Sequence, residues 1–99
     1  MSLHDYPEPF RSDIDSAVRI LKEHGAKDVY LFGSILHTTD PARIGDIDIA
    51  VSGLDPRKYF KAYASLMMAL EHPFDLVDLD DDAAFVRVLR EDGELERVA

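Results

Sequence analysis

The sequence contains 99 residues, of which 46% are hydrophobic, so it can fill one hydrophobic core but is too short for two. Asp and Glu (20) outnumber Lys and Arg (11), and the formal charge of −9 argues against binding long nucleic acid through its phosphates. The absence of cysteine excludes disulfides and cysteine-ligated zinc, and no apolar run is long enough to span a membrane. Since the acidic N-terminus is also unlike a signal peptide, we expect residues 1–99 to form a single cytoplasmic domain.

The first predicted helix begins near Ser12, which forms a cap-like pattern with Asp15, and ends at Gly25. Apolar residues recur within it at helical spacing: Ile14, Ala17, Val18 and Leu21. Residues 28–32 have no polar alternation and stop at Gly33, which is typical of a strand covered on both faces. A turn or short helix is expected directly after this strand.

The second predicted strand spans residues 46–51 and is followed by a helix that Asp55 can cap, with Pro56 in its first turn. Pro73 marks the end of this helical segment. Its predicted apolar face contains Phe60, Tyr63, Ala64 and Met67. Its predicted solvent face contains Arg57, Lys58 and Lys61.

The third predicted strand spans residues 74–79 and is followed by an acidic run, residues 80–82. We expect this run to cap the last helix and to complement its dipole. Apolar residues of that helix are Phe85, Val86 and Leu89. Helices and strands alternate along the chain, which predicts an α/β domain with a small sheet covered by helices.

Two aspartates interrupt the second strand. Side chains alternate between the faces of a strand, so Asp46 and Asp48 point to the same side with Cα atoms roughly 6.5 Å apart. Two carboxylates at this spacing can bind a hard divalent cation such as Mg²⁺. Taken alone, an Asp-x-Asp pair is more typical of two solvated carboxylates at a strand edge.

Two neighbouring features favour a ligand. Gly33-Ser34 directly follows a hydrophobic strand, where a glycine lets backbone N–H groups approach a phosphate and the serine offers its hydroxyl. An ordinary turn with Ser34 as helix cap fits the same two residues. The third strand carries another carboxylate, Asp75, and two acidic strands in one small domain indicate a shared ligand.

Together, Gly33-Ser34, a spacer of eleven residues, the Asp46-Ile47-Asp48 motif and a hydrophobic strand with Asp75 resemble the minimal nucleotidyltransferases of the DNA polymerase beta superfamily. The resemblance extends over residues 12–90, nearly the whole chain. It implies a mixed sheet of three or four strands packed against helices. It also implies transfer of a nucleoside monophosphate, AMP from ATP, to a hydroxyl in the presence of Mg²⁺ or Mn²⁺.

The resemblance assigns a role to each motif residue. Gly33 and Ser34 would hold the triphosphate, Asp46 and Asp48 the metal ions, and Asp75 would complete the acidic triad as a catalytic and metal-binding residue. Minimal nucleotidyltransferases commonly occur beside a helical HEPN protein, as antitoxin to its toxin. The resemblance therefore implies either a HEPN-type partner or self-association through the apolar surface of the 57–72 helix.

The loop after Gly33-Ser34 departs from the common pattern. Many relatives carry a basic residue in a stretch like Gly-Ser-x-Ala-Arg-Gly, whereas residues 35–38 of this chain are Ile-Leu-His-Thr. Arg43, later in the spacer, could reach the triphosphate instead or lie exposed in a loop. A second function is therefore a catalytically weak or inactive domain that acts as an antitoxin by binding its partner.

Overall fold

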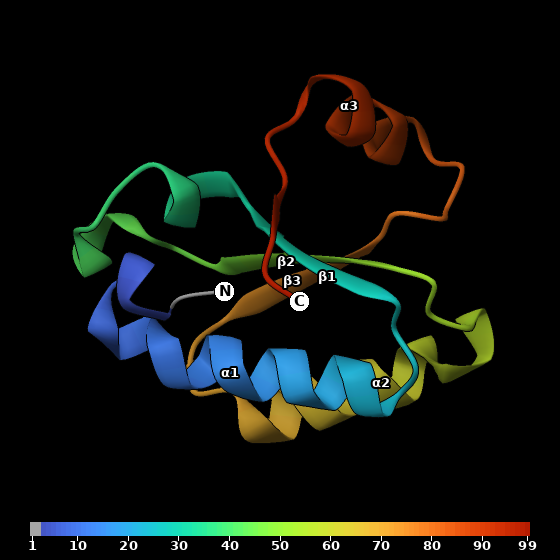
Figure 1. Cartoon of the computed structure of the whole chain (residues 1–99), viewed down its shortest axis with the longest axis horizontal. Coiled ribbons are helices and arrows are strands. Elements are labelled where there is room, and N and C mark those ends of the chain that lie inside the picture. Colours follow the sequence, from blue (N-terminus) through green and yellow to red (C-terminus); the bar gives the residue numbers. More distant parts are fainter. Residues whose placement is uncertain (1–2) are drawn as a thin grey trace.

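The computed structural model describes residues 3–99 as a four-stranded sheet with helices on both faces (Figure 1). The helices are α1 (Glu8–Glu23), α2 (Pro56–Ala69) and α3 (Ala84–Asp92), and short 3-10 turns occupy Leu3–Asp5, Gly33–Leu36 and Pro41–Arg43. The strands are β1 (Asp28–Phe32), β2 (Ile47–Ser52), β3 (Phe74–Asp78) and β4 (Glu96–Arg97). None of the helices in the described residues is long and apolar enough to cross a membrane.

The sheet has the strand order β3-β2-β1-β4 and mixed pairing. β1 pairs antiparallel with β2 and β4, whereas β2 pairs parallel with β3. Helix α2 is the crossover connection between β2 and β3. This arrangement confirms the predicted α/β class with a small mixed sheet. It also brings the carboxyl end of β1 and the amino ends of β2 and β3 to the same end of the sheet.

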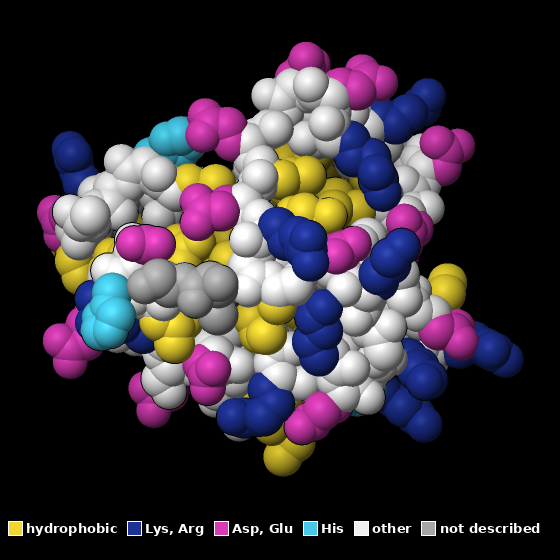
Figure 2. Space-filling view, viewed as in Figure 1, with side chains coloured by type: hydrophobic (Ala, Val, Ile, Leu, Met, Phe, Trp, Pro, Cys, Tyr) yellow, Lys and Arg dark blue, Asp and Glu magenta, His cyan; other side chains and the backbone are white. Residues whose placement is uncertain are grey.

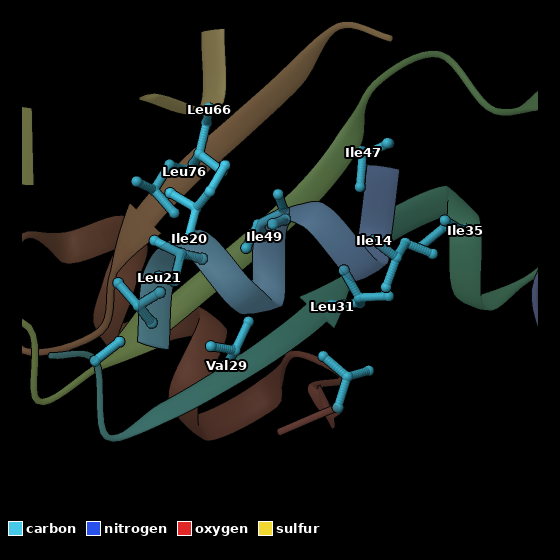
Figure 3. Close-up of a cluster of buried hydrophobic side chains, with 14 of the residues drawn as sticks. Ile14, Ile20, Leu21, Val29, Leu31, Ile35, Ile47, Ile49, Leu66 and Leu76 are labelled. Carbon is cyan, nitrogen blue, oxygen red and sulfur yellow. The ribbon is translucent and has the colours of Figure 1, made fainter. Parts of the chain in front are cut away.

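Helices α1 and α2 cover one face of the sheet, and the larger hydrophobic cluster lies between these helices and that face (Figures 1 and 3). Its fully buried side chains include Ile14, Leu21, Val29, Leu31, Ile47, Ile49, Val51 and Leu66. Burial of one such side chain contributes about 1.5–3 kcal/mol, so this layer dominates the stability of the domain. A smaller cluster under α3 covers part of the opposite face and contains Phe32, Ala50, Leu79, Val86 and Leu89.

The first helix starts earlier than predicted. α1 begins at Glu8 with Pro7 at its N-cap position, and Ser12 lies inside the helix instead of capping it. Prolines are tolerated at this end because the first N–H groups of a helix have no intrahelical partner. The cap-like pattern of Ser12 and Asp15 was therefore a misleading local signal.

The faces of α2 also differ from the prediction. Asp55 caps the helix as predicted, accepting a hydrogen bond from the Arg57 backbone N–H at 2.9 Å. However, the buried residues are Ala62 and Leu66, whereas Phe60 is 79% exposed. The predicted apolar residues Ala64 and Met67 are exposed as well, and Tyr63 is partly buried. The helix has two apolar stripes, and the prediction combined residues from both.

The acidic run 80–82 does not cap α3, whose N-cap is Ala83 without a side-chain hydrogen bond. Asp80 instead accepts a hydrogen bond from the Gly53 N–H at 2.7 Å and pairs with Arg90 at 3.3 Å. Strand β4 was not predicted, because a two-residue strand has no periodicity. The segment is held by long-range backbone bonds, including Val98 N–H to the Val29 carbonyl at 2.8 Å.

Candidate functional site

The residues singled out in the sequence meet at the end of the sheet where β1 finishes and β2 and β3 begin. In the strand register, Asp48 lies opposite Phe32 of β1 on one side and Asp75 of β3 on the other. Residues paired in this way point to the same face. Ile47 and Ile49 belong to the cluster under α1 and α2, so Asp48 and Asp75 project from the other face of the sheet.

Asp48 is partly buried, and its surroundings make ionisation costly. The pKa of Asp48 is raised from its ordinary value by burial first, then by the charge of Asp75 and then by that of Asp46. Asp46 is exposed and lies just before β2, not within it as predicted. The charges of Asp75 and Asp46 therefore both act on Asp48, while the catalytic roles of the three residues stay predictions.

Gly33 provides the space for the Asp48 carboxylate. Its φ of +78° is a conformation that other residues rarely adopt, and a Cβ built at this position would overlap Asp48 Oδ2. Ser34 follows in the turn Gly33–Leu36 and its carbonyl accepts the His37 N–H at 3.0 Å. The Gly33-Ser34 turn thus lies directly against Asp48.

The donor set suits a hard divalent cation, because clustered carboxylate oxygens repel one another until a positive charge is bound. In residues 3–99 no three His, Cys, Asp or Glu side chains already stand close enough together to hold a metal ion. Asp46 and Asp75 are exposed, so their side chains can rotate towards Asp48 on a fast timescale. The residues present fit Mg²⁺ or Mn²⁺ by ligand type and by charge.

Two other candidates from the spacer, His37 and Arg43, are exposed. His37 is exposed, as expected for a loop residue, and its Nε2 is 3.7 Å from Glu94 Oε1, in the connection between α3 and β4. Arg43 is exposed in the turn Pro41–Arg43.

Tyr59 of α2 lies outside the sequence motifs but contacts the acidic strand β3. Burial first, and then the charge of Asp75, raise its pKa, and its hydroxyl donates to the Leu76 carbonyl at 2.6 Å. No local sequence signal connects Tyr59 with β3, because the contact spans 17 positions.

The main surface pockets lie away from the acidic pair Asp48 and Asp75. Four of them are formed by the described residues, and neither Asp48 nor Asp75 lines any of these four. One, of about 440 Å³, lies beside β3 between α2 and α3. Figure 2 shows a separate hollow with a hydrophobic floor between α3 and the sheet, with Lys and Arg side chains along part of its rim.

Comparisons with known proteins agree with the geometry. The family model described as "Polymerase beta, Nucleotidyltransferase" matches residues 15–95. A solved mutant of the toxin–antitoxin complex MntA-HpeT contains a chain that is 28% identical, with 82% of this chain and 69% of that chain covered and a TM-score of 0.59. A comparison with curated protein sequences gave no match.

A second similar structure is a rebuilt and re-refined one of a tri-AMPylated Shewanella oneidensis HEPN toxin in complex with MNT antitoxin. Its matching chain is 28% identical, with 84% of this chain and 67% of that chain covered and a TM-score of 0.55. Another mutant of MntA-HpeT matches at 25% identity, covering 87% of this chain and 70% of that one, with a TM-score of 0.60.

The close contact of Gly33 with Asp48 predicts the effect of Gly33→Ala. The positive φ should cost about 1 kcal/mol of unfolding free energy, and the new methyl group should push the Asp48 carboxylate aside. We therefore expect weaker Mn²⁺ binding in a titration of the folded protein. Gly25→Ala is the matched control, since Gly25 has a φ of +95° but a Cβ added there would meet no atom within 4 Å. Equal Mn²⁺ affinity of the two variants would contradict this interpretation.

The raised pKa of Asp48 predicts that Asp48→Asn stabilises the metal-free protein at pH 7. Above the ordinary pKa of 3.8, the unfolded chain releases this proton before the folded protein does, so the stability contributed by Asp48 falls as pH rises towards its raised pKa. Asparagine removes this cost. Urea unfolding in EDTA should show a higher midpoint for Asp48→Asn at pH 7 and a smaller difference near pH 4. The exposed Asp15→Asn is the control, and a lower midpoint for Asp48→Asn at pH 7 would contradict the prediction.

Proposed function

The chain belongs to the polymerase beta nucleotidyltransferase family, and from this premise we propose that it transfers a nucleoside monophosphate, AMP from ATP, to a hydroxyl group of a protein partner. The main support for the proposal is the position of Asp48, which is paired with Asp75 on β3 and lies directly against Gly33. An acidic pair next to a glycine turn is what a triphosphate and its cation require.

Each motif residue has a task in this proposal. Gly33 and Ser34 hold the triphosphate through backbone N–H groups and the serine hydroxyl, and Asp46 and Asp48 hold Mg²⁺ or Mn²⁺. When bound, the cation neutralises charge on the phosphates and on the oxygens that attack and leave. The remaining work of the protein is to position the acceptor hydroxyl in line with the bond that breaks.

In the chemical step, the acceptor oxygen forms a bond to the α-phosphorus while the bond from this phosphorus to the oxygen bridging to the β-phosphate breaks. Pyrophosphate leaves with the electron pair, and the acceptor loses its proton. Asp75 comes from β3, a different strand from Asp48, and takes this proton or orients the hydroxyl. Its exposure at the sheet edge supports the role, because a residue on the open side can meet an incoming acceptor.

We propose a HEPN-type helical protein as the partner. The similar structures include an MNT antitoxin in complex with a tri-AMPylated HEPN toxin, which supports both the partner class and an acceptor on that partner. On this chain, the outer stripe of α2 is suited to pack against a helix. Its exposed apolar side chains are Phe60 (79%), Met67 (64%) and Met68 (91%). The spacing i, i+7 and i+8 places them on one side of the helix.

A second candidate function is inhibition of the partner by binding alone. It is supported by the loop after Ser34, where Ile35 is buried in the core and His37 stands in place of the arginine common in relatives. Both candidates require the α2 surface, but only the first requires the carboxylates. Incubation of the complex with labelled ATP and Mg²⁺ distinguishes them by whether the label enters the partner.

We expect the three carboxylates to divide their roles by strand. Asp75→Asn should abolish label transfer yet keep Mg²⁺-ATP affinity within about threefold, because Asp46 and Asp48 would still hold the cation. Asp46→Asn and Asp48→Asn should weaken both binding and transfer, because the protein already carries a formal charge of −9 that repels a naked triphosphate. Titration measures binding and label incorporation measures transfer on the same samples.

Asp78→Asn is the control for this series, since Asp78 is also on β3 but on the opposite face from Asp75. Undiminished transfer by Asp75→Asn would remove that residue from the mechanism. An equal loss of ATP binding in all three variants would refute the division of roles.

The partner surface predicts a second result. Phe60→Ser combined with Met68→Ser should weaken the complex with the proposed HEPN-type partner by at least about 30-fold, because buried aromatic anchors dominate interface energy. Calorimetry with the purified proteins measures the affinity. Val88→Ser on α3 is the control, since Val88 is apolar and 57% exposed on another helix. Loss of affinity in the control but not in the α2 variant would place the interface on α3.

A further inference from the structure

A buried carboxylate on α1 is not used by the proposed mechanism. Asp13 is 2% exposed, and it is the only buried charged residue among those that the structure describes. Its neighbours on the inner side of α1 are apolar, including Phe10, Ile14 and Ala17. Burying a carboxylate lowers the stability of the fold unless it accepts hydrogen bonds, so the residues that donate to Asp13 indicate its role.

All the partners of Asp13 come from one short connection, residues 70–73 between α2 and β3. The Glu71 N–H donates to both carboxylate oxygens at 3.0 and 3.1 Å, and the His72 N–H donates to Oδ2 at 2.9 Å. His72 Nδ1 is 2.8 Å from the same oxygen and donates as well, since an ionised carboxylate can only accept. The His72 ring also packs on Phe10, with 4.4 Å between the ring centroids.

This connection leads directly into the acidic site. Pro73 follows His72, and its carbonyl accepts the Ile47 N–H of β2 at 2.9 Å. The first register pair of the two strands is Ile47 with Phe74, and the next is Asp48 with Asp75. The carboxylate of Asp13 therefore holds the backbone three residues before Asp75, at the point where β3 joins β2.

We propose that Asp13, with His72, is a positioning residue that fixes the start of β3 and so keeps Asp75 in register with Asp48. The consequence for transfer rests on the proposed function, but the positioning itself does not. The hydrogen-bond partners of Asp13 are Glu71 and His72 and not the acidic pair, so it acts through the His72–Pro73 backbone. The crossover connection before β3 has no regular secondary structure of its own, which explains why a side chain from α1 has to hold it.

A role in positioning differs measurably from a role in overall stability. The β2–β3 pair is closed by the Ile47 N–H bond to Pro73 at the site end and by the Leu79 N–H bond to the Val51 carbonyl, 2.8 Å, at the far end. Local loosening at the start of β3 exposes only the first of these amides to exchange. Global unfolding exposes both.

The test is Asp13→Asn, followed by backbone amide hydrogen exchange of the full chain under conditions where it stays folded. The asparagine amide has nearly the shape of the carboxylate, but its NH₂ group replaces one acceptor oxygen with a donor, which would face a donor of Glu71 or His72. We expect Ile47 exchange to accelerate by at least about tenfold while Leu79 changes by less than about threefold. Equal acceleration at Ile47 and Leu79, or no change at Ile47, would overturn the proposal.

Two further variants keep the test specific. Tyr6→Phe removes the hydrogen bond from the Tyr6 hydroxyl to Glu96, another tertiary link from the N-terminal segment, but one that leads to β4 at the other edge of the sheet. It should leave the ratio of Ile47 to Leu79 exchange unchanged. His72→Asn keeps a side-chain donor near the position of Nδ1 and should preserve slow Ile47 exchange better than His72→Ala. Equal exchange in the two His72 variants would exclude His72 from the positioning role.

The effect of Asp13 on label transfer is measured in the complex with the partner. Asp13→Asn should reproduce the pattern of Asp75→Asn, with transfer reduced at least about tenfold and Mg²⁺-ATP affinity kept within about threefold. Full transfer by a variant with fast Ile47 exchange would overturn the link to Asp75. If the wild-type protein transfers no label, the proposed function fails, and the exchange measurements alone decide whether Asp13 positions β3.

Discussion

The parallel pairing of β2 with β3 is the constraint on which the candidate site depends. It places Asp48 beside Asp75 on one face, although like charges at adjacent positions repel each other. The pairing persists because the opposite face of the same strands is buried under α1 and α2, with Ile47, Ile49 and Leu76 in the core. The hydrophobic layer on one face thus holds two carboxylates together on the other.

The cost of this arrangement is visible in the pKa of Asp48, which is raised by burial and by its acidic neighbours. A fold optimised for stability alone would not place an aspartate between Phe32 and Asp75. Residues that lower stability in this way are typical of functional sites, where the ligand later compensates for the repulsion. The same reasoning explains why Gly33, the residue without a side chain, lies against Asp48.

Local signals were enough to predict much of this structure. The cap of α2 at Asp55, the turn at Gly33 and the alternation around Asp48 all depend on residues near in sequence, and each of these elements lies where the pattern indicated. Even the common face of Asp48 and Asp75 follows once the two strands are known to be parallel neighbours.

Contacts between distant segments could not be predicted. The 3.6-residue period of α2 fits two apolar stripes, and only the packing against α1 decides that Leu66 is buried and Phe60 exposed. The role of Asp13 is invisible for the same reason, because its partners lie 58 and 59 positions away. β4 exists only through its pairing with β1, and an acidic run such as residues 80–82 suggests a helix cap until its tertiary partners are known.

Helix α2 has two roles in this fold. It is the covalent connection between the two acidic strands, and it carries the two most exposed of the large apolar side chains described here, Phe60 and Met68. A protein that binds its outer stripe therefore binds the segment that leads, through residues 70–73, to Asp75. Thermodynamic linkage is reciprocal. If the bound protein changes the affinity of the acidic pair for a ligand by some factor, that ligand changes the affinity for the protein by the same factor. Cation or nucleotide concentration would in that case also tune how tightly the partner is held.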